Sequence, residues 1–253
     1  FLNEKVKNII ISNGIVQGVE TGHGVYRSSK ILAASGGLSY PSLGGTGDGY
    51  DFAEFAGHKI VEPSPALVEL YAAEKWTGEL TGLSLKNLKI SVPDTKIPPK
   101  TGDFLFTHLG ISGPIVLDIS GEISSMLLRR KNVSISLNFT HKLTRDSWLA
   151  NFAEWRKKNG TKKVKNLVST YLPLSLSIVI CRMASAEDTD ISHLSAPARD
   201  KIISHILACP LTVVGTAGFE KAMLTKGGVD LKEVNPNTLE SRKIKGLFFA
   251  GEV

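Results

Sequence analysis

The chain has 253 residues, of which 42% are hydrophobic and 21% are charged, and its formal net charge is +6. This is the composition of a globular protein with one large core or two modest ones. No run of about 18 apolar residues occurs, which excludes a helix that spans a bilayer, and two cysteines are too few for a disulfide framework or a zinc site, so a reduced, cytoplasmic setting without a metal is expected.

Short strands are predicted for the first part of the chain. Residues 6–11 and 15–20 flank Asn13-Gly14, which is the strongest short hairpin signal in the sequence. A third strand is expected after Gly24, and residues 30–34 form a short apolar run that suits a buried strand.

A loop dense in glycine, residues 35–49, follows, and the spacing of apolar residues then predicts a helix from Tyr50 that stops at Gly57. Pro63-Ser64-Pro65 marks a change in the kind of elements that the sequence predicts. The next elements predicted are strands at 66–70, 85–92 and 133–139 and a helix at 115–128 that begins just after Pro114.

Residues 144–208 predict helices, and the last of them is expected to start at Ser195 as an N-cap. The expected helices span 144–158, 162–172, 174–183 and 196–207, and strands return at 211–215 and 247–250. The fold class is therefore α/β, or α+β overall, with a discontinuous domain that carries an insertion. The expected divisions are 1–62 and 241–253 for the discontinuous domain, 63–139 and 209–240 for a β-rich insert, and 140–208 for a helical subdomain.

Three short motifs favour a ligand site. In the first, the apolar strand that ends at Ala34 runs into Ser35, Gly36 and Gly37. Ligands of open α/β sheets bind at such carboxyl ends, where glycine lets a phosphate or a ring edge approach the backbone. A tight turn without a ligand is the alternative.

The second motif is Thr46-Gly47-Asp48, which leads into the helix at Tyr50. Asp48 is expected to cap that helix, whose free N–H groups would form an anion site; a capped helix after a flexible loop is the alternative. The third motif is the apolar strand that ends in Gly251-Glu252. A carboxylate at a strand end can accept hydrogen bonds from ribose or polyol hydroxyls; the alternative is a plain turn.

Several longer stretches resemble one family, the HI0933-like flavoproteins, also called the BaiN-like or aminoacetone-oxidase family. They occur in the family's order and cover most of the chain outside the helical stretch. The matching stretches are residues 33–41, 45–50, 57–58, 63–68, 106–114, 225–229, 238–242 and 246–253.

The resemblance implies an FAD-binding, Rossmann-like domain interrupted by a β-rich insert with a helical subdomain. It implies that residues 33–37 and 250–252 line the FAD. The family's opening GxGxxG motif and its downstream Gly-Gly-Tyr-Asn segment do not occur in these 253 residues, and Phe1 begins without an initiator Met. We therefore expect an internal piece of a longer flavoprotein that by itself holds FAD weakly or not at all.

His108 is the candidate for proton transfer, because it lies in a glycine-flanked loop and its unperturbed pKa is near neutrality. A histidine that only pins the loop is the alternative, and Thr107 is expected to organise that loop. The other five histidines are expected at the surface or in caps. Thr225 to Gly228 could bring backbone near the flavin, with a structural turn as the equal alternative.

The predicted function is that of an oxidoreductase that uses FAD, with NAD(P)H as a possible redox partner, on a small molecule. The basic groups at 129–131 and 156–165 have no aromatic residues interleaved for base stacking, so no nucleic-acid partner is expected. Two alternatives stay open: a basic nucleic-acid-binding module, and a folded but inactive insert domain.

Overall fold

The computed structural model describes all 253 residues, and the chain divides into two compact units. The first, here called the split unit, comprises residues 1–68 and 217–253; the second, the barrel unit, comprises residues 69–216. Strands and helices occur in both, so the expected mixed α/β class with a β-rich insert is confirmed. None of the helices combines the length and the apolarity that crossing a bilayer requires.

The split unit begins with a three-stranded antiparallel sheet of β1 (Val6–Ser12), β2 (Ile15–Thr21) and β3 (Val25–Arg27). The turn between β1 and β2 has positive φ at Asn13 (51°) and Gly14 (73°). Asn and Gly tolerate that conformation, which matches the twist of a two-residue hairpin. The hairpin predicted at Asn13-Gly14 is therefore confirmed.

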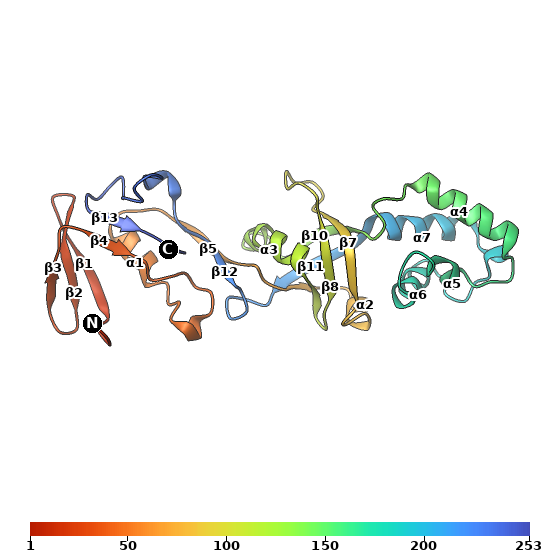
Figure 1. Ribbon diagram of the computed structural model, residues 1–253, viewed down its shortest axis with the longest axis horizontal. Coiled ribbons are helices and arrows are strands. Elements are labelled where there is room, and N and C mark those ends of the chain that lie inside the picture. The colour runs from red at the N-terminus through yellow and green to blue at the C-terminus, as the bar shows by residue number, and fades with distance from the viewer. The chain divides into compact units, whose positions relative to one another are not determined.

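A parallel pair of short strands joins the two ends of the split unit. β4 (Ile31–Ala33) pairs in register with β13 (Leu247–Phe249), and the two lie side by side in Figure 1. The backbone N–H of Ala250 extends the pairing by donating to the Ala33 carbonyl oxygen at 3.1 Å. The two ends of the discontinuous domain that the sequence led us to expect are thus neighbouring strands, and their carboxyl ends point the same way.

The rest of the split unit connects this pair to the insertion. After α1 (Asp48–Phe55), β5 (Ile60–Ala66) pairs antiparallel with β12 (Leu224–Val229). The strand predicted at 66–70 is wrong: Leu67 has a φ of 49°, which breaks the extended backbone, and the next strand starts only at Leu70. The structural units also divide differently from the expected boundaries, since β12 pairs with β5 and so draws residues 217–240 to the split unit.

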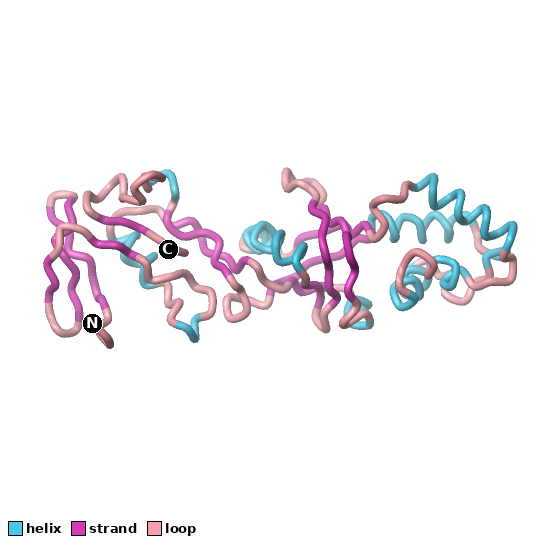
Figure 2. Tube along the Cα trace, in the orientation of Figure 1, coloured by secondary structure: helices cyan, strands magenta, loops and turns pink.

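The barrel unit is built on a closed six-stranded barrel in which all neighbours are antiparallel (Figure 2). The strand order is β10 (Val133–Asn138), β11 (Cys209–Thr216), β6 (Leu70–Ala72), β9 (Gly110–Ser112), β8 (Lys100–Phe106) and β7 (Ser84–Ser91). The sequence predicted β7, β10 and β11 but not β8 and β9. The helix α2 (Trp76–Glu79) follows β6.

The helix α3 (Pro114–Leu127) packs against the barrel with Pro114 at its start, close to the predicted 115–128. Four further helices follow: α4 (Arg145–Lys158), α5 (Val164–Val168), α6 (Leu174–Met183) and α7 (Ala196–Ala208). The N-cap predicted at Ser195 is confirmed, because its hydroxyl accepts the N–H of Ala198. One hydrophobic cluster runs without a break from the barrel into these helices.

The helix predicted at 162–172 is mostly wrong, because only residues 164–168 are helical. Backbone hydrogen bonds join this segment to the chain near Asp190: Val164 N–H donates to Thr189, and Ile191 N–H donates to Lys162. Lys163 is extended and bridges to Asp190. This tertiary pairing uses the backbone of the first predicted turn, so the helix starts late.

Candidate functional site

The three motifs that the sequence singled out meet at the carboxyl ends of β4 and β13. Gly49, in the first turn of α1, lies so close to Ser35 that an added Cβ would stand 2.3 Å from the serine Oγ. It would also stand 3.0 Å from a Val253 side-chain carbon. Ser35 belongs to the first motif, and Gly49 and Val253 directly follow the second and the third, so the fold places all three motifs at one sheet edge.

A polar network ties these strand ends together around Glu252. Its Oε2 accepts hydrogen bonds from the Ser39 hydroxyl at 2.8 Å and from the Thr225 backbone N–H at 3.1 Å. Thr225 Oγ1 in turn accepts the backbone N–H groups of Leu38 (2.9 Å) and Ser39 (3.0 Å). A carboxylate that accepts two hydrogen bonds at one oxygen is held in one orientation.

The second carboxylate oxygen of Glu252, Oε1, takes part in none of the hydrogen bonds or ion pairs of the split unit. It therefore remains as an acceptor for a ligand hydroxyl. The sequence predicted Glu252 as a ligand residue but did not identify Ser39 as its partner. Thr225 belongs to the Thr-Lys-Gly-Gly stretch, for which the sequence left two equal alternatives: backbone near the ligand or a structural turn. In the structure this stretch is part of the strand β12, which has a bulge between Lys226 and Gly228.

The glycines at the strand ends differ in the space that surrounds them. A Cβ on Gly37 would stand 2.5 Å from Thr225 Oγ1 and 3.0 Å from Glu252 Oε2, so the network leaves no room for a side chain there. Gly36 and Gly251 have positive φ (79° and 83°) and no atom within 4 Å of an added Cβ. Their backbone is therefore bare and open to a ligand.

A hollow of about 450 Å³ lies over these strand ends. It is lined by Ala34, Ser35, Gly36, Gly37, Ser39, Tyr40, Leu43, Gly44, Gly45, Met223 and Glu252. A second hollow of about 450 Å³ shares Ala34 and Ser35 with the first and adds Asp48, Phe52 and residues of the first sheet. Of the predicted cofactor residues, Thr46, Gly47 and Gly251 line neither hollow.

Tyr50 holds the third motif in place through a hydrogen bond to Glu252. Its hydroxyl donates to the Glu252 backbone carbonyl oxygen at 2.9 Å. Burial raises the pKa of the Tyr50 phenol, and the nearby Glu252 carboxylate raises it further. The phenol therefore stays protonated at neutral pH and acts as a fixed donor that positions residue 252.

The prediction that Asp48 caps α1 is wrong. Gly47 occupies the N-cap position with a φ of 79°, and no side chain bonds the first N–H groups. Asp48 is the first helical residue, and its carboxylate forms an ion pair with Lys5 at 3.2 Å. Asp48 and Asp51 both lie in the first turn, so the helix start already has anionic partners and disfavours a further anion.

His108 lies in the barrel unit, in the loop between β8 and β9, and is exposed. The loop is pinned by Thr107, as predicted: its hydroxyl donates to Glu69 and accepts the N–H of Gly110 at 3.1 Å. His108 makes no hydrogen bond within the chain and lines a hollow of about 450 Å³ with residues 72–75, 77–79 and Leu109. The structure does not bring His108 into the same unit as the residues at the strand ends.

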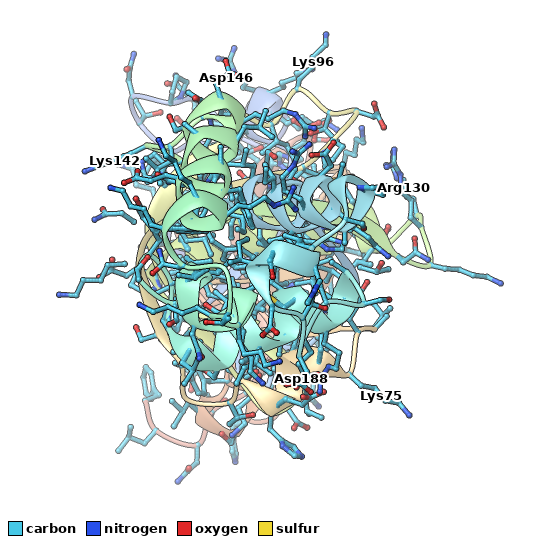
Figure 3. All side chains as sticks on the ribbon, turned by 90° about the vertical axis from the view of Figure 1, so that its right-hand side faces the viewer. Lys75, Lys96, Arg130, Lys142, Asp146 and Asp188 are labelled. Atoms are coloured by element: carbon cyan, nitrogen blue, oxygen red, sulfur yellow. The ribbon has the colours of Figure 1, made fainter.

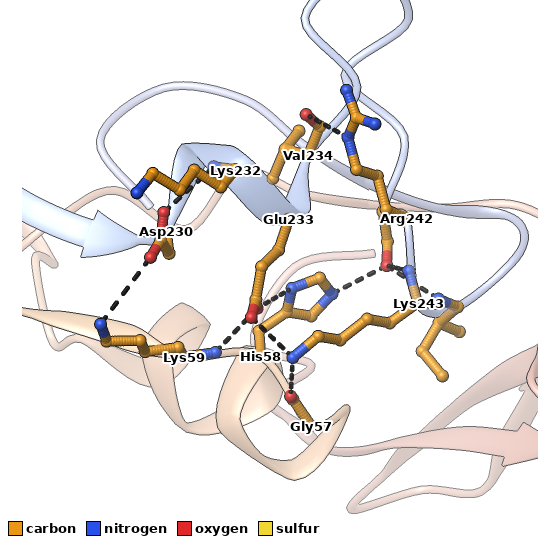
Figure 4. A network of polar contacts seen from close by, with 11 residues as sticks. Gly57, His58, Lys59, Asp230, Lys232, Glu233, Val234, Arg242 and Lys243 are labelled. Atoms are coloured by element: carbon orange, nitrogen blue, oxygen red, sulfur yellow. Dashed lines mark hydrogen bonds and ion pairs between the residues drawn. The ribbon is translucent and has the colours of Figure 1, made fainter.

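His58 corrects the expectation of surface histidines, because its side chain is fully buried (Figure 4). Its Nδ1 lies 3.1 Å from Glu233 Oε2 and its Nε2 lies 2.8 Å from Ser241 Oγ. Glu233 also forms an ion pair with Lys243 at 2.8 Å. The Lys243 ammonium, followed by the backbone N–H of Lys59, lowers the pKa of Glu233 to about 2, and burial lowers the pKa of His58.

This Ser–His–Glu arrangement packs the unit and is not a nucleophilic site. Ser241 Oγ accepts the backbone N–H groups of Lys243 (3.0 Å) and Ile244 (2.8 Å), which uses its acceptor sites, so its hydrogen goes to His58 Nε2. His58 is then the neutral Nδ1–H tautomer that donates to Glu233. Ser241 is 8% exposed and lines neither of the two hollows at the strand ends. No group of three or more His, Cys, Asp or Glu is arranged to hold a metal ion.

A model of the "HI0933-like protein barrel and H2TH domain" matches residues 64–224. The chain is 31% identical over 232 residues to the ribosomal RNA dihydrouridine synthase of Haemophilus influenzae and 30% identical over 229 residues to that of Escherichia coli. These matches cover 90% and 88% of the chain. The 3-dehydro-bile acid delta(4,6)-reductase of Clostridium scindens is 26% identical over 230 residues, or 90% of the chain.

The chain spans about half the length of these curated relatives: 54% of the first two and 56% of the third. Among solved structures, GidA of Aquifex aeolicus in its form II crystal aligns with 98% of the chain and 40% of its own length. It is 13% identical with a TM-score of 0.31, a level that carries no argument about the fold.

Proposed function

The chain belongs to the HI0933-like family, and from this premise we propose that the full-length protein is an FAD-dependent reductase whose substrate is a uracil base of RNA. The names of two relatives, a dihydrouridine synthase and a delta(4,6)-reductase, both describe the addition of hydrogen to an unsaturated ring. FAD, when bound, supplies the hydride for such a reduction.

The strand ends of the split unit fit a flavin nucleotide. Gly36 and Gly251 offer bare backbone next to a hollow of about 450 Å³, and both stand at the carboxyl ends of adjacent parallel strands. Glu252 presents one uncommitted carboxylate oxygen at the same place. We propose that Oε1 of Glu252 accepts a hydrogen bond from a hydroxyl of the cofactor, and that Gly36 and Gly37 approach it with backbone.

Ala34 and Ser35, which line both hollows, would contact the cofactor from the end of β4. Thr46, Gly47 and Asp48 contribute through the start of α1, which packs on Ser35, and Asp48 in addition lines the second hollow. His108 is the proposed proton donor. A reduced nicotinamide is the proposed source of electrons.

The sequence led us to expect a small-molecule substrate and no nucleic-acid partner. RNA is now favoured as the substrate because two relatives that are 31% and 30% identical carry the name of an RNA-modifying enzyme. The chain's positive net charge of +6 agrees with a polyanionic partner. Reduction of a small unsaturated ring is the second candidate, supported by the bile acid reductase at 26% identity.

The cofactor proposal is tested with the purified full-length protein by its absorbance in the flavin bands. Glu252→Gln keeps the shape of the side chain but weakens the acceptor, so we expect FAD to dissociate at least tenfold more readily. Glu20→Gln, at an exposed position of β2, is the control and changes nothing. A full-length protein that never retains flavin would disprove the proposal.

The substrate is tested by incubating the full-length protein with a reduced nicotinamide and either ribosomal RNA or a steroid with conjugated double bonds. Dihydrouridine in nucleosides from the RNA arm is the expected product. Reduction of the steroid alone would reject RNA in favour of the small-molecule candidate. Omitting the nicotinamide tests whether it is the electron donor.

A further inference from the structure

The positive charge of the chain is concentrated in one stretch. Residues 129–165 contain eleven lysines and arginines and only two acidic residues, Asp146 and Glu154. The rest of the chain contains 19 basic and 22 acidic residues, so without this stretch its net charge would be negative. The stretch runs from the loop before β10 through α4 to α5.

These cations do not form a single face. Figure 3 shows Arg130 and Lys142 projecting from opposite sides of the barrel unit. Much of the charge is also neutralised locally: Lys158 pairs with Glu154 at 2.6 Å, Lys165 pairs with Asp188 at 2.7 Å, and Arg145 pairs with Asp200 at 3.2 Å. Sequence charge alone therefore does not locate a contact with a polyanion.

One hollow gathers cations that have no such partner. It measures about 230 Å³ and is lined by Lys86, Asn87, Phe139, Thr140, His141, Lys142 and Leu143. We call it the lysine hollow. No acidic side chain lines it, and neither Lys86 nor Lys142 takes part in an ion pair.

Strand pairing explains why these residues meet. β7 and β10 are antiparallel, with Lys89 opposite Asn138, so the start of β7 lies beside the chain that leaves β10. Residues 86–87 and 139–143 thus face each other although they are more than 50 positions apart in sequence. On the neighbouring strand β8, the Asp103 carboxylate accepts a hydrogen bond from the backbone N–H of Asn87 at 3.3 Å.

The hollow also contains an oriented hydroxyl. Trp148 Nε1–H donates to Thr140 Oγ1 at 3.1 Å, and the Thr140 backbone N–H is taken by Asn138 Oδ1 at 3.0 Å. Because Thr140 Oγ1 already accepts a hydrogen bond, its own hydrogen is free to be donated to an anion in the hollow. Two ammonium groups and a hydroxyl are a suitable donor set for a phosphate.

A second hollow with two arginines is the weaker candidate. It measures about 210 Å³ and contains Arg156 and Arg199. Arg156 already donates to the carbonyl oxygens of Ile191 and Leu194, and Arg199 pairs with Asp200 at 2.8 Å. Its donors are therefore committed within the protein, whereas those of the lysine hollow are not.

We propose that the lysine hollow binds a backbone phosphate of the RNA substrate and so docks the nucleic acid on the barrel unit. The inference rests on the proposed function for the identity of the polyanion. The contact is independent of base sequence, because phosphate contacts position the strand and do not read it. Its contribution weakens with salt, since each neutralised phosphate releases condensed cations.

The test measures binding of a fluorescently labelled ribosomal RNA fragment to the full-length protein over a range of salt concentrations. Lys86→Gln combined with Lys142→Gln removes both ammonium groups, and we expect roughly tenfold weaker binding at low salt and a salt slope that is smaller by about one to two. Arg130→Gln combined with Lys131→Gln also removes two positive charges, at positions that do not line the hollow, and serves as the matched control.

Equal weakening by both double variants would overturn the proposal, because it would mean that only net charge matters. Unchanged binding by the lysine double variant would overturn it as well. Inorganic phosphate forms a separate arm: shifts of the His141 ring signals by phosphate, combined with unchanged RNA affinity in the lysine double variant, would assign the hollow to free anions and reject the RNA contact. Thermal unfolding of all variants verifies that they fold.

The proposed function can fail separately. If the full-length protein forms no dihydrouridine while the lysine double variant still weakens RNA binding selectively, the docking site stands and the reaction is wrong. If dihydrouridine forms normally in the lysine double variant at low RNA concentration, the reaction stands and the docking site is wrong.

Discussion

The two units of this chain are stabilised in different ways. The barrel unit has 148 residues and one cluster of 37 buried hydrophobic residues, whereas the split unit has 105 residues and a cluster of only nine. The split unit instead relies on two polar networks, one around His58 and one around Glu252. Burial gives the barrel unit a stable scaffold, and directional hydrogen bonds fix the strand ends where the ligand site is proposed.

The largest effect is expected from a substitution that disrupts the core of the barrel unit. Trp148 is fully buried, and its ring makes a tilted contact with Phe152 and edge-to-face contacts with Trp155 and Tyr171. Trp148→Ala leaves a cavity, so we expect the free energy of unfolding to fall by about 3 to 5 kcal/mol. Urea unfolding followed by circular dichroism measures it. Leu174→Ala, at a position that is 51% exposed, should change it by less than about 0.5 kcal/mol.

The next effect is expected in the split unit and tests its polar network. In Gly37→Ala the new Cβ would collide with Thr225 and approach Glu252, so we expect a loss of about 1 to 3 kcal/mol. Amide hydrogen exchange should show the loss in residues 1–68 and 217–253 and leave the barrel unit protected. Gly22→Ala is the control, because an added Cβ there meets nothing within 4 Å. Equal loosening of both units would contradict the comparison.

Acid should loosen the split unit before the barrel unit. The pKa of His58 lies below its ordinary 6.5, so its stabilising effect is present above about pH 6.5 and is lost as the pH falls through the lowered value. The pKa of Glu233 falls from 4.5 to about 2, so its effect is present above pH 4.5 and is lost as the pH falls toward 2. Both act in the same direction.

Amide hydrogen exchange between about pH 7 and pH 4 checks this ordering, after correction for the intrinsic pH dependence of exchange. We expect residues 57–59 and 230–244 to lose protection first. His58→Asn removes one titrating group, so its pH dependence should be shallower than that of the unmodified chain. Protection that falls in parallel in both units would mean that the buried histidine does not control the acid response.

The smallest expected effect concerns a helix end in the barrel unit. Ser195 caps α7 through a hydrogen bond from the Ala198 N–H at 3.3 Å, so Ser195→Ala should lower the free energy of unfolding by about 1 kcal/mol. Ser204→Ala, on the exposed side of the same helix, is the control and should have almost no effect. A large loss at Ser195 would indicate that the helices depend on local capping more than on the shared core.

Local signals predicted the fold where one segment determines its own structure. Asn13-Gly14 gave the hairpin because both residues accept positive φ, and Ser195 marked the start of α7 because its side chain can cap it. The segment at 162–172 failed because backbone bonds to residues 189–191 displaced the first helical turn. Strands β8 and β9 were missed because their neighbours in the barrel, and not their sequence, define them.

The residues of the candidate site likewise divide into those that the sequence predicted and those that it did not. The glycine-rich strand ends and Glu252 were visible in the sequence, and they meet at one edge because β4 and β13 pair in parallel. The sequence did not reveal Ser39 as a partner of Glu252, because the contact joins residues 213 positions apart. Asp48 looked like a cap by its residue type, but Gly47 adopts the left-handed conformation that begins the helix and the carboxylate turns to Lys5.

The pairing of β5 with β12 has a practical consequence. Ala66 and Leu224 are opposite each other in register, and the Met223 N–H donates to the Leu67 carbonyl oxygen. The chain therefore leaves the split unit and re-enters it at two adjacent positions. A tight turn could join the two strands directly and complete an ordinary hairpin. The barrel and its helices are thus an insertion between two adjacent positions of the split unit. A shortened gene could express the split unit alone, or a different insert could be joined at the same two positions.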